Sequence, residues 1–371
     1  MSESIKHIIE KFDVQDANWL AEPFGSGHIN DTYKVYCSSE PQISYLLQRV
    51  NHHVFKDVDG LMSNLQIVLK HLKDKYRERG EVDVDKKTLT LIPTKDGQSF
   101  VKDQDGNYWR MFILLENTRS YDIVENQEQA FAGGQAFGEF QAMLADLDVE
   151  ELIEILPNFH NIDFRLSNFH NAIKKNSHDR VDAVQELIDY IEARQEKMRR
   201  VLAMGEKGLI PTRITHNDTK FNNVLLDQDD QVQCVIDLDT VMPGFVAYDF
   251  GDAIRTIINK AAEDEPNEDN IQLNIPLFDA YAKGYLSKAQ HFLSADEIES
   301  LMYGVLLLPY MQAVRFLTDY LEGDHYYKIQ YANHNLVRTK AQLRLVKELE
   351  ANEEKLTKLL YAHVDKNTTE V

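Results

Sequence analysis

The spacing of apolar residues changes once along this chain, near residue 116, and that change limits the folds open to it. Before this point, Tyr33 and Val35 alternate with polar neighbours, as do Ile43, Tyr45 and Leu47, and an apolar run follows at residues 108–115. Alternation with a period of two is typical of half-buried strands. Leucines recur every three or four positions at residues 58–76, which predicts one helix among the strands.

Helical patterns fill most of the second part of the chain. We expect helices at residues 127–147, 184–202, 296–320 and 334–362. The first contains glycines and alanines among its phenylalanines, and such small residues would let a neighbouring helix approach closely. An island of strand character interrupts the helices at Ile214, residues 224–226 and residues 232–238. The predicted fold class is therefore α+β, with a small β-rich N-terminal lobe at residues 1–115 and a larger helical lobe at residues 116–371.

Composition narrows the class of function. Forty Lys and Arg against 61 Asp and Glu give a formal net charge of −21, which repels phosphate backbones and anionic membranes. We therefore expect neither nucleic acid nor a membrane as a partner. The apolar run at residues 305–310 is too short to span a bilayer and residues 1–12 lack a signal-peptide core, so a cytoplasmic location is predicted. Cys37 and Cys234 lie far apart and are expected to be plain buried thiols.

The strongest functional signal lies in the island of strands. Residues 216–223, His-Asn-Asp-Thr-Lys-Phe-Asn-Asn, have the form His-x-Asp-x-x-x-x-Asn, and Asp237 follows an apolar strand. Phosphoryl transfer needs a carboxylate that takes the proton of the attacking hydroxyl, and an amide and a second carboxylate that hold magnesium on the phosphates of ATP. This spacing predicts Asp218 as the base, Asn223 and Asp237 as Mg²⁺ ligands, and Lys220 as a charge directed at the phosphoryl group. A single aspartate in this segment could equally be a turn residue, but the whole ordered set of residues favours a catalytic site.

Two weaker signals lie upstream. Gly25-Ser26-Gly27 precedes a strand, and a glycine loop between strands is how kinases cover nucleotide phosphates, although an ordinary hairpin turn has the same sequence. Arg49 lies on the next predicted strand and shares its apolar face, from which it can offer a cation to the nucleotide. Protein kinases have Lys at this point and a Glu in the following helix. Here Asp57, Asp59 or a residue elsewhere in the chain could take the place of that Glu, and Arg49 could also be a surface residue.

Together these segments resemble the aminoglycoside phosphotransferase and choline kinase superfamily, and within it the N-acetylhexosamine 1-kinases. The similar segments are the glycine loop, residues 47–49, 216–223, 236–244, 248–252, 315–324 and 334–338. The resemblance implies a bilobal protein-kinase-like fold with ATP between the lobes and a hinge near residues 112–117, where Glu116 would contact the nucleotide. It also implies that Asp218 activates the anomeric hydroxyl of an N-acetylhexosamine. By the same resemblance His28, Arg315 and Tyr327 would line the sugar pocket, with Asp239 and Thr240 nearby.

Several alternatives stay open at the level of the sequence. Arg315 could form a salt bridge with Asp319, one helical turn further on, and Tyr327 could be a packing aromatic. The acceptor could be another small hydroxyl compound of the choline, homoserine or aminoglycoside type, and a cationic one would suit the acidic surface. The absence of the kinase Lys and helix Glu also allows a nucleotide-binding protein without catalysis. Neither the epimer preference nor the oligomeric state follows from the sequence.

Overall fold

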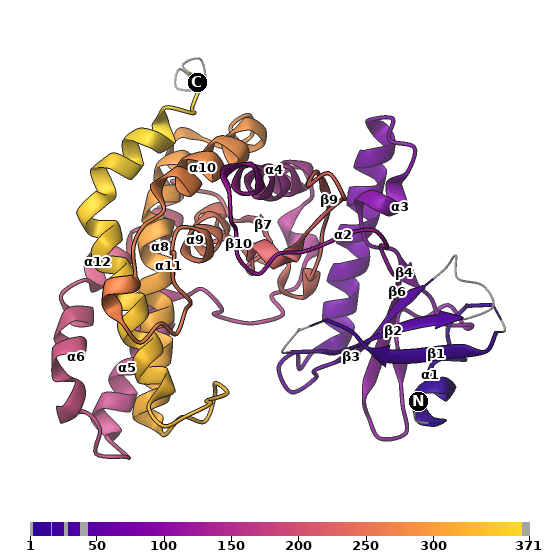
Figure 1. The fold of residues 1–371 in the computed structure, drawn as a ribbon, viewed down its shortest axis with the longest axis horizontal. Helices are drawn as coiled ribbons and strands as arrows, with labels where there is room; N and C mark the ends of the chain where they lie inside the picture. The colour runs from indigo at the N-terminus through magenta and orange to yellow at the C-terminus, as the bar shows by residue number, and fades with distance from the viewer. Residues whose placement is uncertain (1–2, 16, 26–28, 38–43, 366–371) are drawn as a thin grey trace. The chain divides into compact units, whose positions relative to one another are not determined.

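The computed structural model describes residues 3–15, 17–25, 29–37 and 44–365 (Figure 1). The chain forms two compact units. Unit 1 comprises Met1–Arg119, Asp146–Pro157 and Leu225–Met242, and unit 2 comprises Ser120–Ala145, Asn158–Val224 and Pro243–Val371. Unit 1 contains a β-sheet and unit 2 is mainly helical, which confirms the predicted α+β class. The predicted lobe boundary between residues 115 and 116 stays a prediction.

Within the described residues, unit 1 is built on a six-stranded antiparallel sheet with the order β1-β2-β3-β6-β4, and β5 also pairs with β6. The strands are β1 (Trp19–Pro23), β2 (Asp31–Cys37), β3 (Tyr45–Val50), β4 (Leu91–Ile92), β5 (Val101–Lys102) and β6 (Tyr108–Ile113). The other elements of this unit are α1 (Glu3–Ile9), α2 (Val58–Glu78), α3 (Val84–Lys87), η1 (Val149–Glu151), β9 (Val232–Val235) and η4 (Leu238–Thr240). The helix predicted at residues 58–76 is thus confirmed as α2.

The two faces of this sheet differ in character. Val35, Leu47 and other alternating residues of one face pack with Phe12 and the buried side of α1. In Figure 1, α1 lies beside β1 of this sheet. Gln48 and Arg110 are opposite one another in the register of β3 and β6, and their side chains belong to the other face. Because side chains alternate along a strand, the position of a residue in the register decides which of these environments it meets.

Unit 2 contains the long helices. Its helices are α4 (Gln127–Leu144), α5 (Ile162–Lys175), α6 (Gln185–Glu192), α7 (Gln195–Met198), α8 (Arg200–Glu206), α9 (Val246–Ile257), α10 (Ile275–Ala289), α11 (Ala295–Glu322) and α12 (His334–Tyr361). Short 3₁₀ turns are η2 (Asp182–Val184), η3 (Phe221–Asn223) and η5 (Glu268–Asn270). The predicted strand island is present as β7 (Arg213–Thr215), β8 (Val224–Leu226) and β9, with β10 (Met242–Gly244) following.

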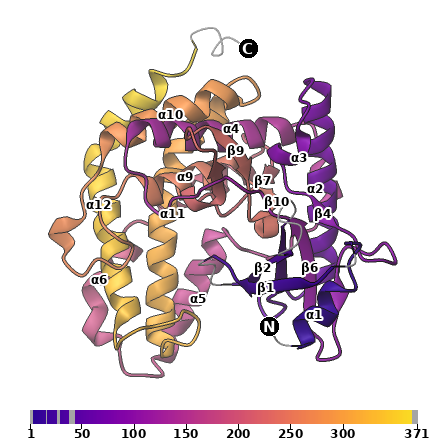
Figure 2. The same cartoon turned by 45° about the vertical axis from the view of Figure 1, so that its right-hand side comes forward.

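The small residues of α4 allow the close approach that the sequence predicted. α4 lies alongside α10 (Figure 1 and Figure 2). A Cβ atom on Gly134 would lie 2.2 Å from the carbonyl oxygen of Tyr281, and one on Gly138 would lie 2.5 Å from that of Tyr285. Gly284 of α10 is similarly close to the backbone of α4. Any side chain larger than hydrogen at these positions would force the two helices apart.

The single helix predicted at residues 184–202 is wrong, because three short helices, α6, α7 and α8, occupy this segment. Its apolar periodicity is preserved, since Ile188, Ile191 and Met198 are buried. The first break has a local cause. The Arg194 guanidinium donates to the carbonyl of Tyr190 at 3.2 Å, while the Arg194 N–H turns to Ile191 at 3.0 Å. A side chain therefore takes the carbonyl that an uninterrupted helix would pair with the backbone N–H.

Two sequence predictions concern burial. Cys37 and Cys234 are both buried free thiols, as expected. α11 is long and apolar enough to meet the criteria for crossing a membrane, and 78% of that stretch is buried inside the described structure.

Candidate active site

The predicted catalytic motif forms a loop in unit 2 between β7 and β8. Asn217 adopts a left-handed backbone conformation, with φ of 65°, which turns the chain before the half-buried Asp218. Lys220 Nζ lies 2.8 Å from Asp218 Oδ1. Asn223 Nδ2 donates to the Asp218 carbonyl at 2.8 Å. The structure therefore brings together a carboxylate, an ammonium and an amide from one short segment.

Asp249 of α9 holds the backbone of this loop. Its two carboxylate oxygens accept hydrogen bonds from the N–H groups of His216 at 2.8 Å and Asn217 at 2.7 Å, and Gln141 of α4 adds a third at 2.7 Å. Burial raises the pKa of the Asp249 carboxyl, and the charge and hydrogen bonds of its neighbours oppose that shift. A buried carboxylate with these donors fixes the direction of the loop.

Asp252, one turn further along α9, connects the loop to the charged side chain of Arg255. It accepts from the Thr219 N–H at 3.1 Å and forms an ion pair with Arg255 at 2.8 Å. Burial disfavours its ionised form, but Arg255 and Lys220 outweigh burial and lower the pKa of Asp252. The pKa of Lys220 is raised because Asp218 and Asp252 outweigh the opposing effect of burial. Lys220 therefore stays protonated beside Asp218.

Two buried histidines, His216 within the motif and His160 outside it, hold the backbone of the loop. His216 packs edge-on against Phe137 and Phe140, and its Nδ1 accepts from the Asp218 N–H at 3.3 Å. His160 Nε2 donates to the Asn217 carbonyl at 3.1 Å. Burial lowers the pKa of His160 to about 4, so its ring is neutral near pH 7. Sequence reasoning missed His160, because nothing in its neighbourhood in the sequence marks it.

The residues predicted to bind magnesium have suitable oxygen atoms. Asn223 uses its Nδ2 for the bond to Asp218, which leaves its Oδ1 available as a ligand. Asp237 is exposed in unit 1, where a left-handed backbone with φ of 58° precedes η4. Amide and carboxylate oxygens are the ligands that Mg²⁺ accepts, usually together with phosphates and water. In the part of the chain that the structure describes, no cluster of three or more His, Cys, Asp or Glu offers another metal site.

Two of the residues predicted to contact the nucleotide, Gly25 and Glu116, lie in unit 1 among the described residues. Gly25 has φ of 78°, and no atom of the described residues lies within 4 Å of its missing Cβ. Ser26, Gly27 and His28 lie outside the described residues. Glu116 is exposed and accepts from the Ser44 hydroxyl at 2.8 Å.

Arg49 pairs with Asp31 of the neighbouring strand and lies near the ring of Trp109. It is on the face of β3 that packs against α1, and Asp57, proposed from the sequence as its partner, instead caps α2 by accepting from the Gly60 N–H.

A buried cation that sequence reasoning missed lies on the other face of the sheet. Arg110 of β6 is only 2% exposed. Its guanidinium donates to Gln48 Oε1 at 2.9 and 3.0 Å and forms an ion pair with Asp239 at 2.6 Å. Asn30 donates to the second Asp239 oxygen at 2.7 Å. This network joins the segment after the glycine loop, the central sheet and the turn after Asp237 within unit 1.

The predicted sugar-binding residues Arg315 and Tyr327 come together in unit 2. The Arg315 guanidinium carbon lies 5.6 Å from the centre of the Tyr327 ring. Gln312 connects them, because it accepts from Arg315 at 3.2 Å and donates to the Tyr327 hydroxyl at 3.4 Å.

The salt bridge considered between Arg315 and Asp319 is not formed. Asp319 is buried and accepts instead from the N–H groups of residues 325–327, between 2.8 and 2.9 Å, and from Asn335 at 2.8 Å. Asp319 therefore positions the segment that carries Tyr327.

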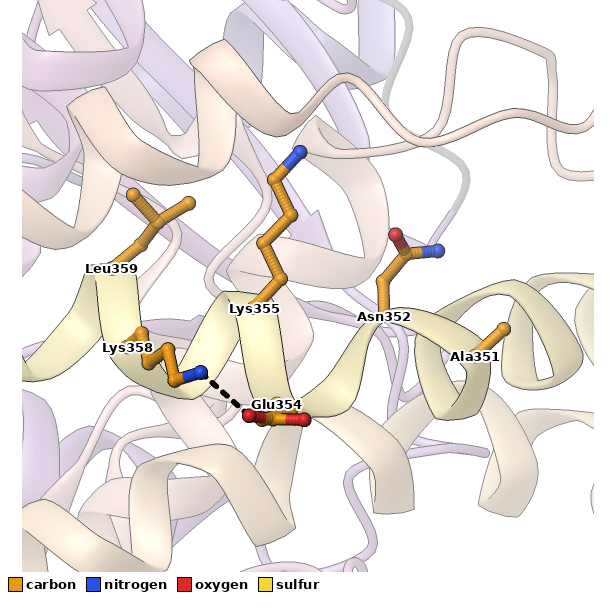
Figure 3. Close-up of a pocket in the computed structure, with 6 residues that line it drawn as sticks. All are labelled: Ala351, Asn352, Glu354, Lys355, Lys358 and Leu359. Carbon is orange, nitrogen blue, oxygen red and sulfur yellow. Dashed lines mark hydrogen bonds and ion pairs between the residues drawn. The ribbon is translucent and has the colours of Figure 1, made fainter.

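A shallow hollow on α12 carries no comparable arrangement. Figure 3 shows its six lining residues, all on this one helix, with an ion pair between Lys358 and Glu354. One face of a single helix brings together no side chains from different elements.

Comparison with known proteins gives one family and one fold. The profile of a family described as "Phosphotransferase enzyme family" matches residues 21–285. Among solved structures, the microcompartment-associated aminopropanol kinase is 16% identical, with a TM-score of 0.59 over 95% of this chain and 98% of that one. A choline kinase from Cryptosporidium parvum Iowa II is 14% identical, with a TM-score of 0.59 over 98% and 99% of the two chains. An amicoumacin kinase in complex with AMP-PNP and Ca²⁺ is 10% identical, with a TM-score of 0.58 over 94% of each. At these identities the structures show a shared fold.

Proposed function

Because the chain belongs to the phosphotransferase enzyme family, we propose that it transfers the γ-phosphoryl group of ATP to a hydroxyl group of a small molecule. The observation that carries this proposal is the loop of unit 2, in which Asp218, Lys220 and Asn223 meet. A carboxylate that can accept a hydroxyl proton, with a positive charge beside it, suits phosphoryl transfer to a hydroxyl.

In this proposal each residue has a separate task. Asp218 accepts the proton of the acceptor hydroxyl, and its ion pair with Lys220 fixes the direction of the carboxylate. Lys220 places positive charge beside the phosphoryl group during transfer. Asn223 and Asp237 would hold magnesium, which neutralises charge on the phosphates when bound. Gly25, Ser26, Gly27, Arg49 and Glu116 are proposed to contact the nucleotide.

For the acceptor we propose an N-acetylhexosamine that is phosphorylated on its anomeric hydroxyl. The support is the sequence resemblance together with the fixed donors and aromatic rings around Arg315 and Tyr327. The anomeric hydroxyl is more acidic than an ordinary alcohol, which suits a carboxylate base. His28, which lies outside the described residues, is proposed to contribute to the same pocket.

A cationic amino alcohol is the second candidate acceptor. The likeness in fold to an aminopropanol kinase and a choline kinase favours it, as does the net charge of −21. The positive charge of Arg315 beside Tyr327 disfavours it, because like charges repel within a partly buried site.

A panel of acceptors in an ADP-release assay tests the proposal. N-acetylglucosamine, N-acetylgalactosamine, choline, homoserine and 1-aminopropan-2-ol are compared, and phosphorus and carbon NMR locates the new phosphate. We expect a hexosamine 1-phosphate. Phosphate at C6, or efficient turnover of an amino alcohol alone, would refute the hexosamine assignment and leave the kinase assignment intact.

Asp218→Asn is the matched variant, because it keeps the size of the side chain and removes the base. We expect turnover to fall by about a hundredfold or more while ATP binding is nearly unchanged. If the folded variant keeps more than about a tenth of the wild-type turnover, the assignment of Asp218 as the base is wrong.

A further inference from the structure

Unit 2 contains a group of side chains in which two arginines lie among aromatic rings. We call it the arginine cluster, and it consists of Phe159, Arg165, Gln312, Arg315 and Tyr327. Arg165 comes from α5, while Gln312 and Arg315 come from α11. Phe159 and Tyr327 lie in the segments that precede α5 and follow α11.

The contacts hold both guanidinium groups in defined positions. Arg315 lies with its guanidinium carbon 5.6 Å from the ring centres of both Phe159 and Tyr327. Arg165 donates through Nη2 and Nε to the Phe159 carbonyl, at 2.7 and 3.3 Å. Each guanidinium has five N–H donors, so most of the donors of both arginines are left for another partner.

Neither arginine has a carboxylate partner among the residues that the structure describes. Asp319, the acid nearest to Arg315 along α11, is fully engaged by backbone N–H groups and Asn335. Burial and the neighbouring charge of Arg315 lower the pKa of Arg165 to about 10. Two arginines that both contact Phe159 and have no carboxylate partner among the described residues repel one another, and such a pair is unexpected in a chain with 61 acidic and 40 basic residues.

The arginine cluster lies next to the catalytic loop. His160 follows Phe159 in the chain, and its Nε2 donates to the carbonyl of Asn217, the residue before Asp218. The Phe159 ring contacts the His160 ring, with 4.6 Å between the ring centres, and the same Phe159 ring lies 5.6 Å from the Arg315 guanidinium carbon. Through Phe159 and His160, contacts therefore run from the arginine cluster to Asn217, the residue that precedes Asp218.

We propose that the arginine cluster binds an oxyanion, a carboxylate or a phosphate, carried by the acceptor itself. Guanidinium groups bind such groups through paired hydrogen bonds, and these are strongest where the aromatic surroundings exclude water. The inference rests on the proposed function and makes its acceptor more specific. The preferred substrate is an acidic N-acetylated sugar rather than a neutral one.

Matched pairs of acceptors test directly whether a negative charge on the acceptor raises the rate. N-acetylmuramic acid is compared with its methyl ester, and N-acetylglucosamine 6-phosphate with N-acetylglucosamine. We expect kcat/KM to be about tenfold or more higher for the anionic member of at least one pair. The pair that shows the preference identifies the oxyanion as carboxylate or phosphate. Equal rates, or faster turnover of both neutral members, overturn the inference and leave the proposed function standing.

Substitution of Arg165 tests whether the cluster causes the preference. Arg165→Gln should lower kcat/KM for the anionic member at least about tenfold more than for the neutral one, and Arg165→Lys should recover part of the difference. Arg199→Gln is the control, because Arg199 already pairs with Asp163 and Glu206 and should leave both rates unchanged. An equal loss for both members in Arg165→Gln would mean a packing role and would overturn the inference.

Binding of the acceptor is measured separately from its phosphorylation, so that a failure of the proposed function can be distinguished from a failure of this inference. Without ATP and at matched ionic strength, N-acetylmuramic acid and N-acetylglucosamine 6-phosphate are tested for stabilisation against heat. A shift that only the anionic compounds give, and that Arg165→Gln removes, supports the arginine cluster even if no compound in the panel is phosphorylated. Absence of such a shift in the wild type overturns the inference.

Discussion

Asp218 depends on side chains that lie outside its own sequence motif. Asp249 accepts two N–H groups of the loop, and His160 donates to the Asn217 carbonyl. The motif could be predicted from the sequence because its members are neighbours along the chain. The contacts of Asp249 and His160 with the loop could not be predicted in this way. They join residues that are 32 and 57 positions apart in the sequence and follow no local pattern.

His160 should make the folded protein less stable in acid. Its pKa falls from 6.5 in the unfolded chain to about 4 in the fold, so the unfolded chain takes up the proton first. The stability contributed by the neutral ring is therefore fully present above pH 6.5 and is lost as the pH falls towards 4. The total loss is about 3 kcal/mol. Urea unfolding across this pH range measures it.

His160→Gln isolates this effect, because the amide keeps an N–H donor for Asn217 and carries no ring that can be protonated. The free energy of unfolding should depend less steeply on pH in this variant than in the wild type. Identical pH slopes in the two proteins would show that the His160 ring is not the group responsible.

At the scale of elements, the position of the loop depends on how α9 packs, since α9 carries both Asp249 and Asp252. α9 crosses α11 at two glycines. A Cβ atom on Gly251 would lie 2.3 Å from the carbonyl oxygen of Gly304, and one on Gly304 would lie 1.9 Å from that of Ala247. This contact is formed by backbone atoms of both helices. An added Cβ atom therefore cannot be accommodated by the movement of a flexible side chain.

Gly304→Ala should therefore destabilise the fold by about 1–3 kcal/mol and lower turnover at the same time, because the helices must separate and carry Asp249 with them. Thermal melting and initial rates measure the two effects. Gly80→Ala is the comparison, since Gly80 has no atom within 4 Å of its missing Cβ: its φ of 79° costs the alanine about 1 kcal/mol, but no helix must move and turnover should stay unchanged. A Gly304→Ala protein as stable and active as the Gly80→Ala protein would contradict the proposed packing constraint.

The elements that the sequence predicted well are those with long, uninterrupted periodicity. The patterns at residues 58–76 and 334–362 correspond closely to α2 and α12. The single helix predicted at residues 184–202 is wrong, and its first break lies where the Arg194 side chain competes for a backbone carbonyl, which apolar spacing does not report. Arg315 and Asp319 have the spacing of a helical salt bridge, yet Asp319 is taken by the loop at residues 325–327, a partner that only the fold reveals.

At the scale of the whole molecule, the net charge of −21 acts against every anionic ligand that approaches the chain. ATP, the phosphoryl donor in the proposed function, is strongly anionic, so its binding would depend on positive charge supplied close by. Arg49 is paired with Asp31, and Arg110 with Asp239. The positive charges of Arg49 and Arg110, the two sheet residues considered above, are thus largely neutralised by their carboxylate partners. Besides Lys220, a metal ion on the phosphates would therefore be the most effective source of positive charge.

Asp237→Ala should accordingly weaken Mg²⁺-dependent ATP binding by about tenfold or more and lower turnover with it, because a metal ligand acts on both binding and chemistry. Calorimetric titration with ATP, with and without Mg²⁺, measures the binding. Asp229→Ala is the control, because it removes the same charge from the exposed loop before β9. If Asp237→Ala binds Mg-ATP as tightly as Asp229→Ala does, the metal ligand lies elsewhere. Asp239 would be a poor substitute, since Arg110 and Asn30 already occupy its two oxygens.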